Sequence, residues 1–394
     1  MKSEWKTIRA ADFMEFNPRM NLKKGTIATK ISMDKLQPYT KKIPETEQAE
    51  FSGGTKFSNS DTIMARITPC LENGKTAFVD CLNKDEVAFG STEFIVLRAK
   101  PGVSDAQFVY YLATSPEFRQ VAIKSMVGSS GRQRVQQPVL ENLELVVPEL
   151  PKQKRIGGFL AAIDDKIALN AKINDNLEQQ AATYFQELFI NNANPVWQIS
   201  TISDLGTVVG GSTPSKTKPE YYTNNGIAWI TPKDLSINKS KFISHGENDI
   251  TELGLKNSSA TVMPKGTVLF SSRAPIGYIA IASNEVTTNQ GFKSVIPYSE
   301  IGTAFVYFFL KHSLPVIESA ASGSTFKEIS GNAMKNIPAI IPDRNTLDQF
   351  NSFCAPIFAQ QKILEEQNHS LAMLRDSLLP KLMSGAIDIA SIQL

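Results

Sequence analysis

The sequence is poor in the residues that most often carry metal or redox chemistry. It has three histidines and three cysteines among 394 residues. His245, His312 and His369 lie far apart, and no cysteine or carboxylate stands at metal-ligand spacing from them. The three cysteines cannot all pair in disulfides, and they do not stand at the spacing of metal ligands. This favours reduced, mostly buried thiols in a cytoplasmic protein. We therefore expect neither a metal site nor a disulfide framework.

Long apolar runs and a strong charge imbalance are absent too. No run approaches the ~18 apolar residues that a membrane span needs. The segment Met1 to Lys6 is polar, so we expect no secretory signal, no membrane association and a cytoplasmic location. The net charge is only +2, so any nucleic-acid surface must be local. The 42% hydrophobic and 20% charged residues are typical of a globular chain with two or three domains.

Three short segments only partly match catalytic motifs. Asn17-Pro18-Arg19-Met20 is a fragment of the adenine-methyltransferase motif, which requires two prolines followed by an aromatic residue. Gly74-Lys75-Thr76 fails as a phosphate loop because Pro69 stands where the first glycine is required. Asp164-Asp165-Lys166 resembles part of a nuclease site but lies inside a helix with heptad spacing, where a solvated face is the simpler interpretation. The sequence predicts no catalytic residues and no cofactor.

The chain contains an internal duplication. At a constant shift of 194 residues, the segment from Ser130 to Pro148 aligns with the segment from Ser324 to Pro342 without a gap. Val135 then meets Ile329, and Leu188 meets Leu382 further along. Upstream the match is looser but keeps its order, since Ile31-Ser32-Met33-Asp34-Lys35-Leu36 resembles Ile230-Thr231-Pro232-Lys233-Asp234-Leu235. Coincidental helix periodicity would not explain these upstream matches.

Each copy has a globular part followed by a long helix. The globular parts mix β-rich runs such as Glu93 to Leu97 and Thr267 to Phe270 with helical stretches such as Asp105 to Thr114 and Ile301 to His312. We place the first globular domain at 1–150, its helix at 151–194, the second globular domain at 195–343, and the last helix with its tail at 344–394. This organisation predicts an α+β fold.

The helices show the alternating four-three apolar spacing of a coiled coil. We call these positions the seam. In the first helix they are Ile156, Leu160, Ile163, Ile167, Asn170, Asn174, Leu177, Ala181, Tyr184 and Leu188. In the second helix they are Phe350, Cys354, Ile357, Gln361, Leu364, Asn368, Leu371, Arg375, Leu378 and Leu382.

Caps and prolines set the expected ends of these helices. Pro151 suits a first helical position. Thr346 and Gln349 form a capping-box pattern at the start of the second helix. Pro356 should kink or divide that helix, and Pro380 should end it or bend its last turn.

Several segments together resemble the specificity subunits of type I restriction-modification systems. The C-terminal run Leu378-Leu379-Pro380-Lys381-Leu382-Met383-Ser384-Gly385-Ala386-Ile387 resembles the signature that ends these proteins. Gly210-Gly211-Ser212-Thr213-Pro214, Pro219-Glu220-Tyr221-Tyr222 and Ile230 to Leu235 resemble the opening of their target-recognition domains. Leu150 to Ile156 resembles the entry to their central helix. The order of domain, helix, domain, helix covers essentially the whole chain.

The resemblance implies an architecture and a set of partners. Two α/β target-recognition domains would be separated by two long antiparallel coiled-coil helices and related by a pseudo-twofold axis. Each domain would read one half of a bipartite site in double-stranded DNA, and the helices would set the unread spacer. Two methyltransferase subunits would dock on the helices, restriction subunits would join through the complex, and S-adenosylmethionine would bind the methyltransferase subunits. The chain itself would be non-catalytic.

An antiparallel pairing also suggests a register for the helices. If Ile156 lies opposite Leu382, and Leu188 opposite Phe350, then Asn170 faces Asn368. A buried amide pair at that level would favour one register at some cost in stability. A wet or partner-covered middle of the helix pair is the equally weighted alternative.

Candidate DNA-binding residues are basic or amide side chains in turns. Lysine and arginine neutralise phosphates, while arginine and glutamine can also read base edges. The candidates are Lys23, Lys24, Lys30, Arg132, Gln133, Arg134, Lys216, Lys218, Lys233 and Lys327. A solvated surface charge is at least as good an interpretation of each one singly. Apolar residues off the seam, of which Ile363 and Met373 are the test pair, are candidates for docking the methyltransferase.

Two other functions are compatible with parts of the pattern. A fused methyltransferase or nuclease would need the motifs that are missing. A scaffold that carries two globular domains on a coiled-coil strut and binds no DNA would fit the duplication, but not the terminal signature.

Overall fold

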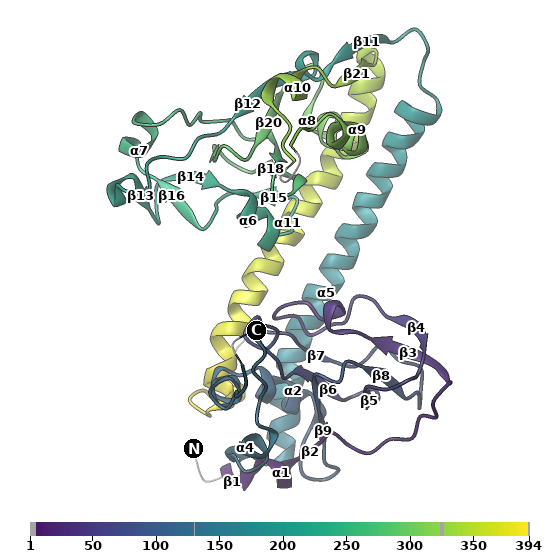
Figure 1. Ribbon diagram of the computed structural model, residues 1–394, viewed down its shortest axis with the longest axis vertical. Helices are drawn as coiled ribbons and strands as arrows, with labels where there is room; N and C mark the ends of the chain where they lie inside the picture. The colour runs from purple at the N-terminus through teal and green to yellow at the C-terminus, as the bar shows by residue number, and fades with distance from the viewer. Residues whose placement is uncertain (1–4, 130, 324–326, 393–394) are drawn as a thin grey trace. The chain divides into compact units, whose positions relative to one another are not determined.

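The computed structural model describes residues 5–129, 131–323 and 327–392 and divides into two compact units. The first unit comprises 1–169 and 367–394, and the second comprises 170–366. Each unit therefore combines one globular segment with part of each long helix (Figure 1). Ser130 and Ser324, where the predicted alignment starts, and Met1 to Glu4 of the polar N-terminal segment lie outside the described residues.

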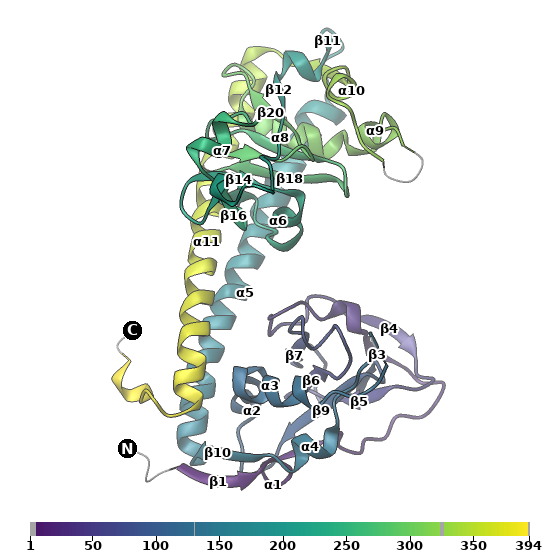
Figure 2. The same cartoon turned by 60° about the vertical axis from the view of Figure 1, so that its left-hand side comes forward.

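The first unit contains two four-stranded sheets and a two-stranded ribbon. One sheet has the order β2-β9-β6-β7, the other has the order β4-β3-β8-β5, and β1 pairs with β10 (Figure 2). The strands are β1 Trp5–Arg9, β2 Met14–Phe16, β3 Ile27–Ile31, β4 Glu47–Glu50, β5 Thr55–Phe57, β6 Thr62–Ala65, β7 Thr76–Phe78, β8 Ala88–Gly90, β9 Phe94–Ala99 and β10 Glu144–Pro148. The short helices are α1 Ala10–Phe13, α2 Ala106–Thr114, α3 Pro116–Lys124 and α4 Gln137–Glu141.

The side chains of the strand β9 point alternately to the two faces of its sheet, and this shows which layers lie on either side. In β9, Phe94 and Val96 pack against the second sheet, whereas Ile95 and Leu97 pack toward α2 and the long helices. Successive side chains of a strand point to opposite faces, so a fully apolar strand can be buried on both sides. Phe108 of α2 lies in the same core as Ile95 and Leu97. The layers therefore run from sheet to sheet to α2 to the helix pair.

The second unit repeats this plan. Its sheets have the orders β12-β20-β17-β18-β15 and β13-β16-β14-β19, and β11 pairs with β21. The strands are β11 Gln198–Thr201, β12 Gly206–Gly210, β13 Tyr222–Thr223, β14 Ile227–Ile230, β15 Phe242–Ile243, β16 Asn248–Ile250, β17 Val268–Ser272, β18 Ile276–Ala282, β19 Thr287–Thr288, β20 Lys293–Pro297 and β21 Pro338–Ile341. The short helices are α6 Pro232–Ile237, α7 Glu252–Lys256, α8 Thr303–His312, α9 Leu314–Ser319 and α10 Gly331–Lys335.

The two long helices are α5 Leu150–Gln186, which continues in a π-helical turn over Glu187–Asn191, and α11 Arg344–Met383. The structure corrects the expected ends and breaks of α11. Asp343 provides the cap, since its carboxylate accepts a hydrogen bond of 3.0 Å from the Thr346 amide, so the helix starts before Thr346. The helix also continues through Pro356 and Pro380, so Pro356 does not divide it and Pro380 does not end it. Cys354 and Ile357, on either side of Pro356, are buried, and their packing offsets the missing hydrogen bond.

Within each unit the helix segments pair antiparallel. In the first unit, Asn368 Nδ2 donates to the Ile167 carbonyl at 3.2 Å. In the second unit, Gln361 Nε2 donates to the Asn174 carbonyl at 3.1 Å. The expected register placed Asn174 opposite Leu364, so this contact lies about one helical turn away from that level.

The α+β prediction with two long helices is confirmed, and the duplication extends to sheet topology. In both units, the first strand of the main sheet (β2 or β12) lies at its edge and is antiparallel to the strand beside it (β9 or β20). A parallel pair, β3 with β8 or β14 with β19, recurs in the second sheet. The cysteines are free, as expected, but Cys81 is exposed rather than buried.

Candidate functional site

A hollow of about 660 Å³ opens on the second unit. It lies where the loop after β12 meets the start of α6 and the segments that follow β17 and β19. Its lining combines cations, amides and hydroxyls around one aromatic side chain, and includes Thr213, Lys216, Trp229, Thr231, Lys233, Ser236, Asn248, Arg273, Asn289 and Gln290. Such a surface offers both phosphate ligands and base-reading groups.

The glycine-rich loop after β12 forms one wall of this hollow. A Cβ on Gly211 would lie 2.1 Å from the Asn289 carbonyl oxygen, so only glycine allows the close approach. The next residue, Ser212, donates its amide to the Thr288 carbonyl at 2.9 Å, and its own carbonyl accepts from Trp229 Nε1 at 3.0 Å. The loop is thereby fixed in place, with Thr213 hydrogen bonded to the Gln290 side chain.

A capping box positions Lys233 at the edge of the hollow. The Asp234 carboxylate accepts hydrogen bonds from the Thr231 amide at 2.7 Å and from the Thr231 hydroxyl at 2.6 Å. Pro232 stands at the first turn of α6, where its missing N–H costs nothing. Lys233 then projects to the surface and pairs with Glu247 at 2.6 Å, which raises the pKa of Lys233. The Ile230 to Leu235 segment therefore builds part of this surface.

Arg273 belongs to a second charge group at the same hollow. Glu328 accepts from Arg273 Nη1 at 3.2 Å and lies 3.7 Å from Lys293 Nζ. Lys327 is exposed directly beside Glu328. Arg273 and Lys293 thus share one carboxylate, and Lys327 adds an exposed positive charge next to it in the sequence.

The first unit has a polar hollow at the topologically equivalent loop. About 530 Å³ in volume, it is lined by the loop after β2, residues 17–21, and by Gly54, Thr55 and Lys56. Asn17 anchors the loop, because its Oδ1 accepts from the Val96 amide at 2.9 Å and its Nδ2 donates to Gln137 at 2.7 Å. Arg19 is exposed on this loop, and Lys23 and Lys24 are exposed directly after it.

The Arg132 to Arg134 turn lies beside the exit of β6. The Thr68 amide donates to the Gln133 carbonyl at 3.0 Å, and Arg132 is exposed. Arg134 binds Glu93 through Nε and Nη2, the latter at 2.6 Å, and this contact lowers the pKa of Glu93. At the shift of 194, the position of Arg134 is taken in the second unit by Glu328, which also forms an isolated β-bridge there. The equivalent positions thus carry opposite charges.

The structure brings only some of the predicted residues together. Lys216 and Lys233 line one hollow, and Lys23 and Lys24 adjoin the other. Lys30 pairs with Glu47 at 2.7 Å, and the Lys218 ammonium lies 5.3 Å from the centre of the Tyr221 ring. Neither lysine lines either of these hollows. Sequence reasoning missed Arg19, Arg273, Asn289 and Gln290. The position of Arg273, between a strand and Ala274-Pro275, is a turn signal that could have indicated it.

The seam residues of both helices are buried or half-buried. Ile156, Leu160, Ile163, Asn170, Ile357 and Leu364 are buried, whereas Ile167, Asn174, Leu177, Leu188, Asn368, Leu371 and Leu378 are half-buried. Near the end of α5, Phe185 and Phe189 are buried more deeply than the seam positions beside them. Off the seam, Ile363 is 47% exposed and Met373 is 60% exposed.

The described part of the chain contains neither a metal-ligand cluster nor a helix that could span a membrane. Across residues 5–129, 131–323 and 327–392, no group of three histidine, cysteine or acidic side chains is placed to hold a metal ion. Over the same residues, no helix combines the length and apolarity that a membrane crossing requires.

Comparison with known proteins identifies related sequences. The model of the type I restriction modification DNA specificity domain matches residues 2–179 and 195–368. The chain is 43% identical over 162 residues to the MjaIX specificity subunit of a type I restriction enzyme from Methanocaldococcus jannaschii, a match covering 41% of this chain and 37% of that relative. It is 23% identical to the HindI specificity subunit of Haemophilus influenzae, over 84% of this chain and 87% of the relative.

A solved structure has the same fold. The crystal structure of the type I restriction-modification system S subunit from M. genitalium aligns over 96% of both chains, with a TM-score of 0.56 and 17% sequence identity.

Proposed function

The chain belongs to the family of type I restriction-modification DNA specificity domains, and from this premise we propose that it directs DNA methylation to a bipartite target. In this proposal residues 1–150 read one half-site and residues 195–343 read the other. The chain performs no chemistry itself. S-adenosylmethionine binds to the partner methyltransferase subunits, and the complex acts on double-stranded DNA in the cytoplasm.

One observation carries the proposal. Both units place a loop after the first strand of the main sheet beside a hollow whose lining includes basic and amide side chains, although the two loops share little sequence. The loop residues of the first hollow include Arg19 and Asn21, and those of the second include Thr213 and Lys216. Two domains that read different base pairs require the same arrangement of loop and hollow with different polar groups in each.

The long helices supply the spacing and the docking surface in this proposal. Helices of 37 and 40 residues rise about 55–60 Å, which exceeds one duplex turn of ~34–36 Å. Two methyltransferase subunits would dock along the helices, with exposed Ile363 and Met373 among the contacts, and restriction subunits would join through them. The exposed apolar area on otherwise polar helix faces supports this assignment.

Reconstitution tests the proposal. The purified chain should methylate nothing with S-adenosylmethionine, ATP and Mg²⁺, and should confer sequence-specific adenine methylation once its methyltransferase subunits are added. A gel shift with partner subunits separates this function from that of a scaffold that binds no DNA, since a scaffold would assemble without retarding the duplex. Turnover by the isolated chain above a heat-killed control would contradict the proposal.

A further inference from the structure

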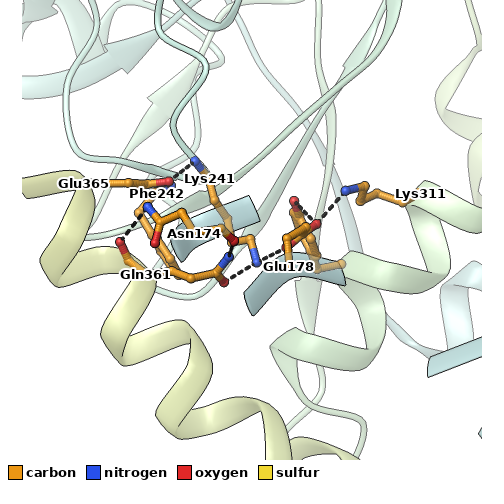
Figure 3. Close-up of polar contacts among 8 residues, drawn as sticks. Asn174, Glu178, Lys241, Phe242, Lys311, Gln361 and Glu365 are labelled. Atoms are coloured by element: carbon orange, nitrogen blue, oxygen red, sulfur yellow. Dashed lines mark hydrogen bonds and ion pairs between the residues drawn. The ribbon is translucent and has the colours of Figure 1, made fainter. Parts of the chain in front are cut away.

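A buried lysine connects the second globular domain to both long helices. Lys241 directly precedes β15, and its side chain is 6% exposed. Its Nζ forms an ion pair with Glu178 of α5 and donates a hydrogen bond of 2.6 Å to Gln361 Oε1 of α11 (Figure 3). The same ammonium lies 4.1 Å from the centre of the Phe358 ring and 4.8 Å from that of Tyr307. One side chain thus contacts three segments that are far apart in sequence.

The backbone beside Lys241 is attached to α11 as well. The Glu365 carboxylate accepts from the Lys241 amide at 2.8 Å and from the Phe242 amide at 3.1 Å (Figure 3). Gln361 in turn donates to the Asn174 carbonyl, which joins the two helices at the same level. The domain is therefore held at a defined position along the helices by directional contacts.

Glu178 receives a second set of donors from the globular domain. Its Oε1 accepts from Lys311 Nζ at 2.5 Å and from the Tyr307 hydroxyl at 3.3 Å, both on α8. Burial favours a higher pKa for Glu178, but the charges and hydrogen bonds of Lys241 and Lys311 outweigh it and hold this pKa below the ordinary value. Burial lowers the pKa of Lys241, and the charge of Glu178 opposes that effect. Each group is buried at a cost that its partner offsets.

The first unit has a lysine at the equivalent place. The Lys41 carbonyl accepts from the Phe78 amide, as the Lys241 carbonyl accepts from the Ile281 amide. The Lys41 side chain is 2% exposed, and its Nζ lies 4.0 Å from Asp165 of α5. It also lies 5.8 Å from the centre of the Tyr111 ring on α2, the counterpart of α8. Both copies therefore bury a lysine between the globular domain and the helices, although their acidic partners differ.

Apolar packing alone would fix the level of the domain less firmly. A helix surface repeats its ridges every turn, about 5.4 Å along the axis, so an apolar contact has several nearly equivalent registers. A slip of one turn exceeds the ~3.4 Å rise of one base pair. A buried ion pair has one good geometry, and the best-attested use of such pairs is to select one register at some cost in stability.

We propose that Lys241 is a positioning residue that fixes the level of the second recognition domain on the helices and so restricts the complex to one spacer length. This inference rests on the proposed function, because a spacer has meaning only if the two domains read separate half-sites. Lys241 is buried by elements of its own unit, so it reads no base itself; it acts through the placement of the hollow that contains Lys216 and Gln290.

The test compares spacer selectivity in the reconstituted methyltransferase complex. Duplexes carry the two half-sites of the wild-type target with the native spacer or with one base pair more or fewer. The selectivity is the ratio of the methylation rate on the native spacer to the rate on an altered one. Lys241→Met should lower this ratio at least tenfold while the half-site bases stay the same. Lys239→Met is the matched control, since Lys239 stacks on Tyr278 and donates to the Leu235 carbonyl within the domain.

A double variant separates position from stability. Lys241→Met leaves Glu178 buried with fewer donors, so the single variant loses stability as well. Lys241→Met with Glu178→Gln removes both charges and leaves an amide that accepts from Lys311, so no buried charge is left without its partner. We expect this variant to melt near the wild type and still to lose selectivity. If the methionine variants do not fold, Glu365→Gln replaces them in the test. It weakens the two backbone contacts to Lys241 and Phe242, and it should also lower the spacer selectivity.

The outcomes distinguish this inference from the proposed function. A folded double variant with wild-type spacer selectivity would overturn the positioning role alone. A uniform loss of rate on every spacer, with the ratio unchanged, would overturn it too, because that is the result of a purely structural role. A wild-type complex that methylates all spacers equally, or none, would instead contradict the proposed function.

Discussion

Arg375 of α11 and Asp164 of α5 form a buried ion pair in the first unit, with 2.6 Å between Nη1 and Oδ1 and side chains 14% and 5% exposed. The Tyr111 hydroxyl of α2 donates to the other carboxylate oxygen at 2.5 Å. Burial opposes the charge of Arg375, but Asp376 and Asp164 outweigh it and raise the pKa of the guanidinium. Asp164 therefore joins both long helices to the globular domain of this unit.

The first prediction concerns the stability of that unit. Arg375→Met leaves the Asp164 carboxylate buried with one donor, and breaking a buried pair in this way typically costs about 3–5 kcal/mol. Tyr111→Phe removes a single hydrogen bond to a charged group and should cost about 1.5–3 kcal/mol. Denaturant unfolding followed by circular dichroism measures both changes. Arg9→Met is the control, because the Arg9–Asp12 pair is exposed and its loss should not move the midpoint. Equal midpoints for all three variants would contradict the role of Asp164.

The second prediction concerns base reading by the hollow of the second unit. Arg273→Ala and Gln290→Ala should each weaken binding of the target by about 1–3 kcal/mol and relax the sequence preference in one half-site only. Competition binding with duplexes mutated in either half-site measures the effect. Lys335→Ala removes a surface cation on α10, outside the lining of the hollow, and should leave both half-sites unchanged. If preference relaxed in both halves, or in neither, this hollow would not be the reading surface.

The third prediction concerns docking of the methyltransferase. Ile363→Glu and Met373→Glu place charges on exposed apolar positions, so they should weaken recruitment of methyltransferase subunits without unfolding the chain. A pull-down beside circular dichroism measures recruitment and folding together. Leu253→Glu, an equally exposed apolar position on α7, should leave recruitment intact. Folded helix variants that still bind both subunits with undiminished affinity would exclude these positions from the interface.

The fourth prediction concerns the length of the helices. One heptad inserted in register into both α5 and α11 adds about 10.5 Å, close to three base pairs at ~3.4 Å each. The methylated motif should then keep both half-sites and gain about three unread base pairs. Methylome sequencing of cells that express the variant gives the spacer directly. An unchanged spacer in an active variant would mean that the helices do not set it.

The regular features of the fold could be predicted from the sequence because they depend on local periodicity. The four-three spacing located both long helices, and apolar runs located β9 and β17 to within two residues at either end. Pro356 does not divide α11, an outcome that the local backbone preference of proline could not predict. There, buried neighbours keep α11 continuous, and that packing depends on residues far away in sequence.

The polar contacts between the domains and the helices could not be predicted. Lys241 and Gln361 are 120 residues apart, and nothing in the Lys241-Phe242-Ile243 segment distinguishes it from an ordinary strand. Among the DNA-binding candidates, lysines in glycine-rich turns were easy to select. Arg273 and Gln290 were not selected, because their placement depends on how the ends of β17 and β19 meet the loop after β12.

The most direct test of the central claim is a domain exchange read by methylome sequencing. Residues 1–150 are replaced by the corresponding domain of a related specificity subunit, and the variant is expressed with its methyltransferase subunits in cells that lack other adenine methylation. If each domain reads one half-site, the modified motif should change in one half, while the other half and the spacer stay as in the wild type. A motif that changes in both halves, or in neither, would contradict independent reading of a bipartite target.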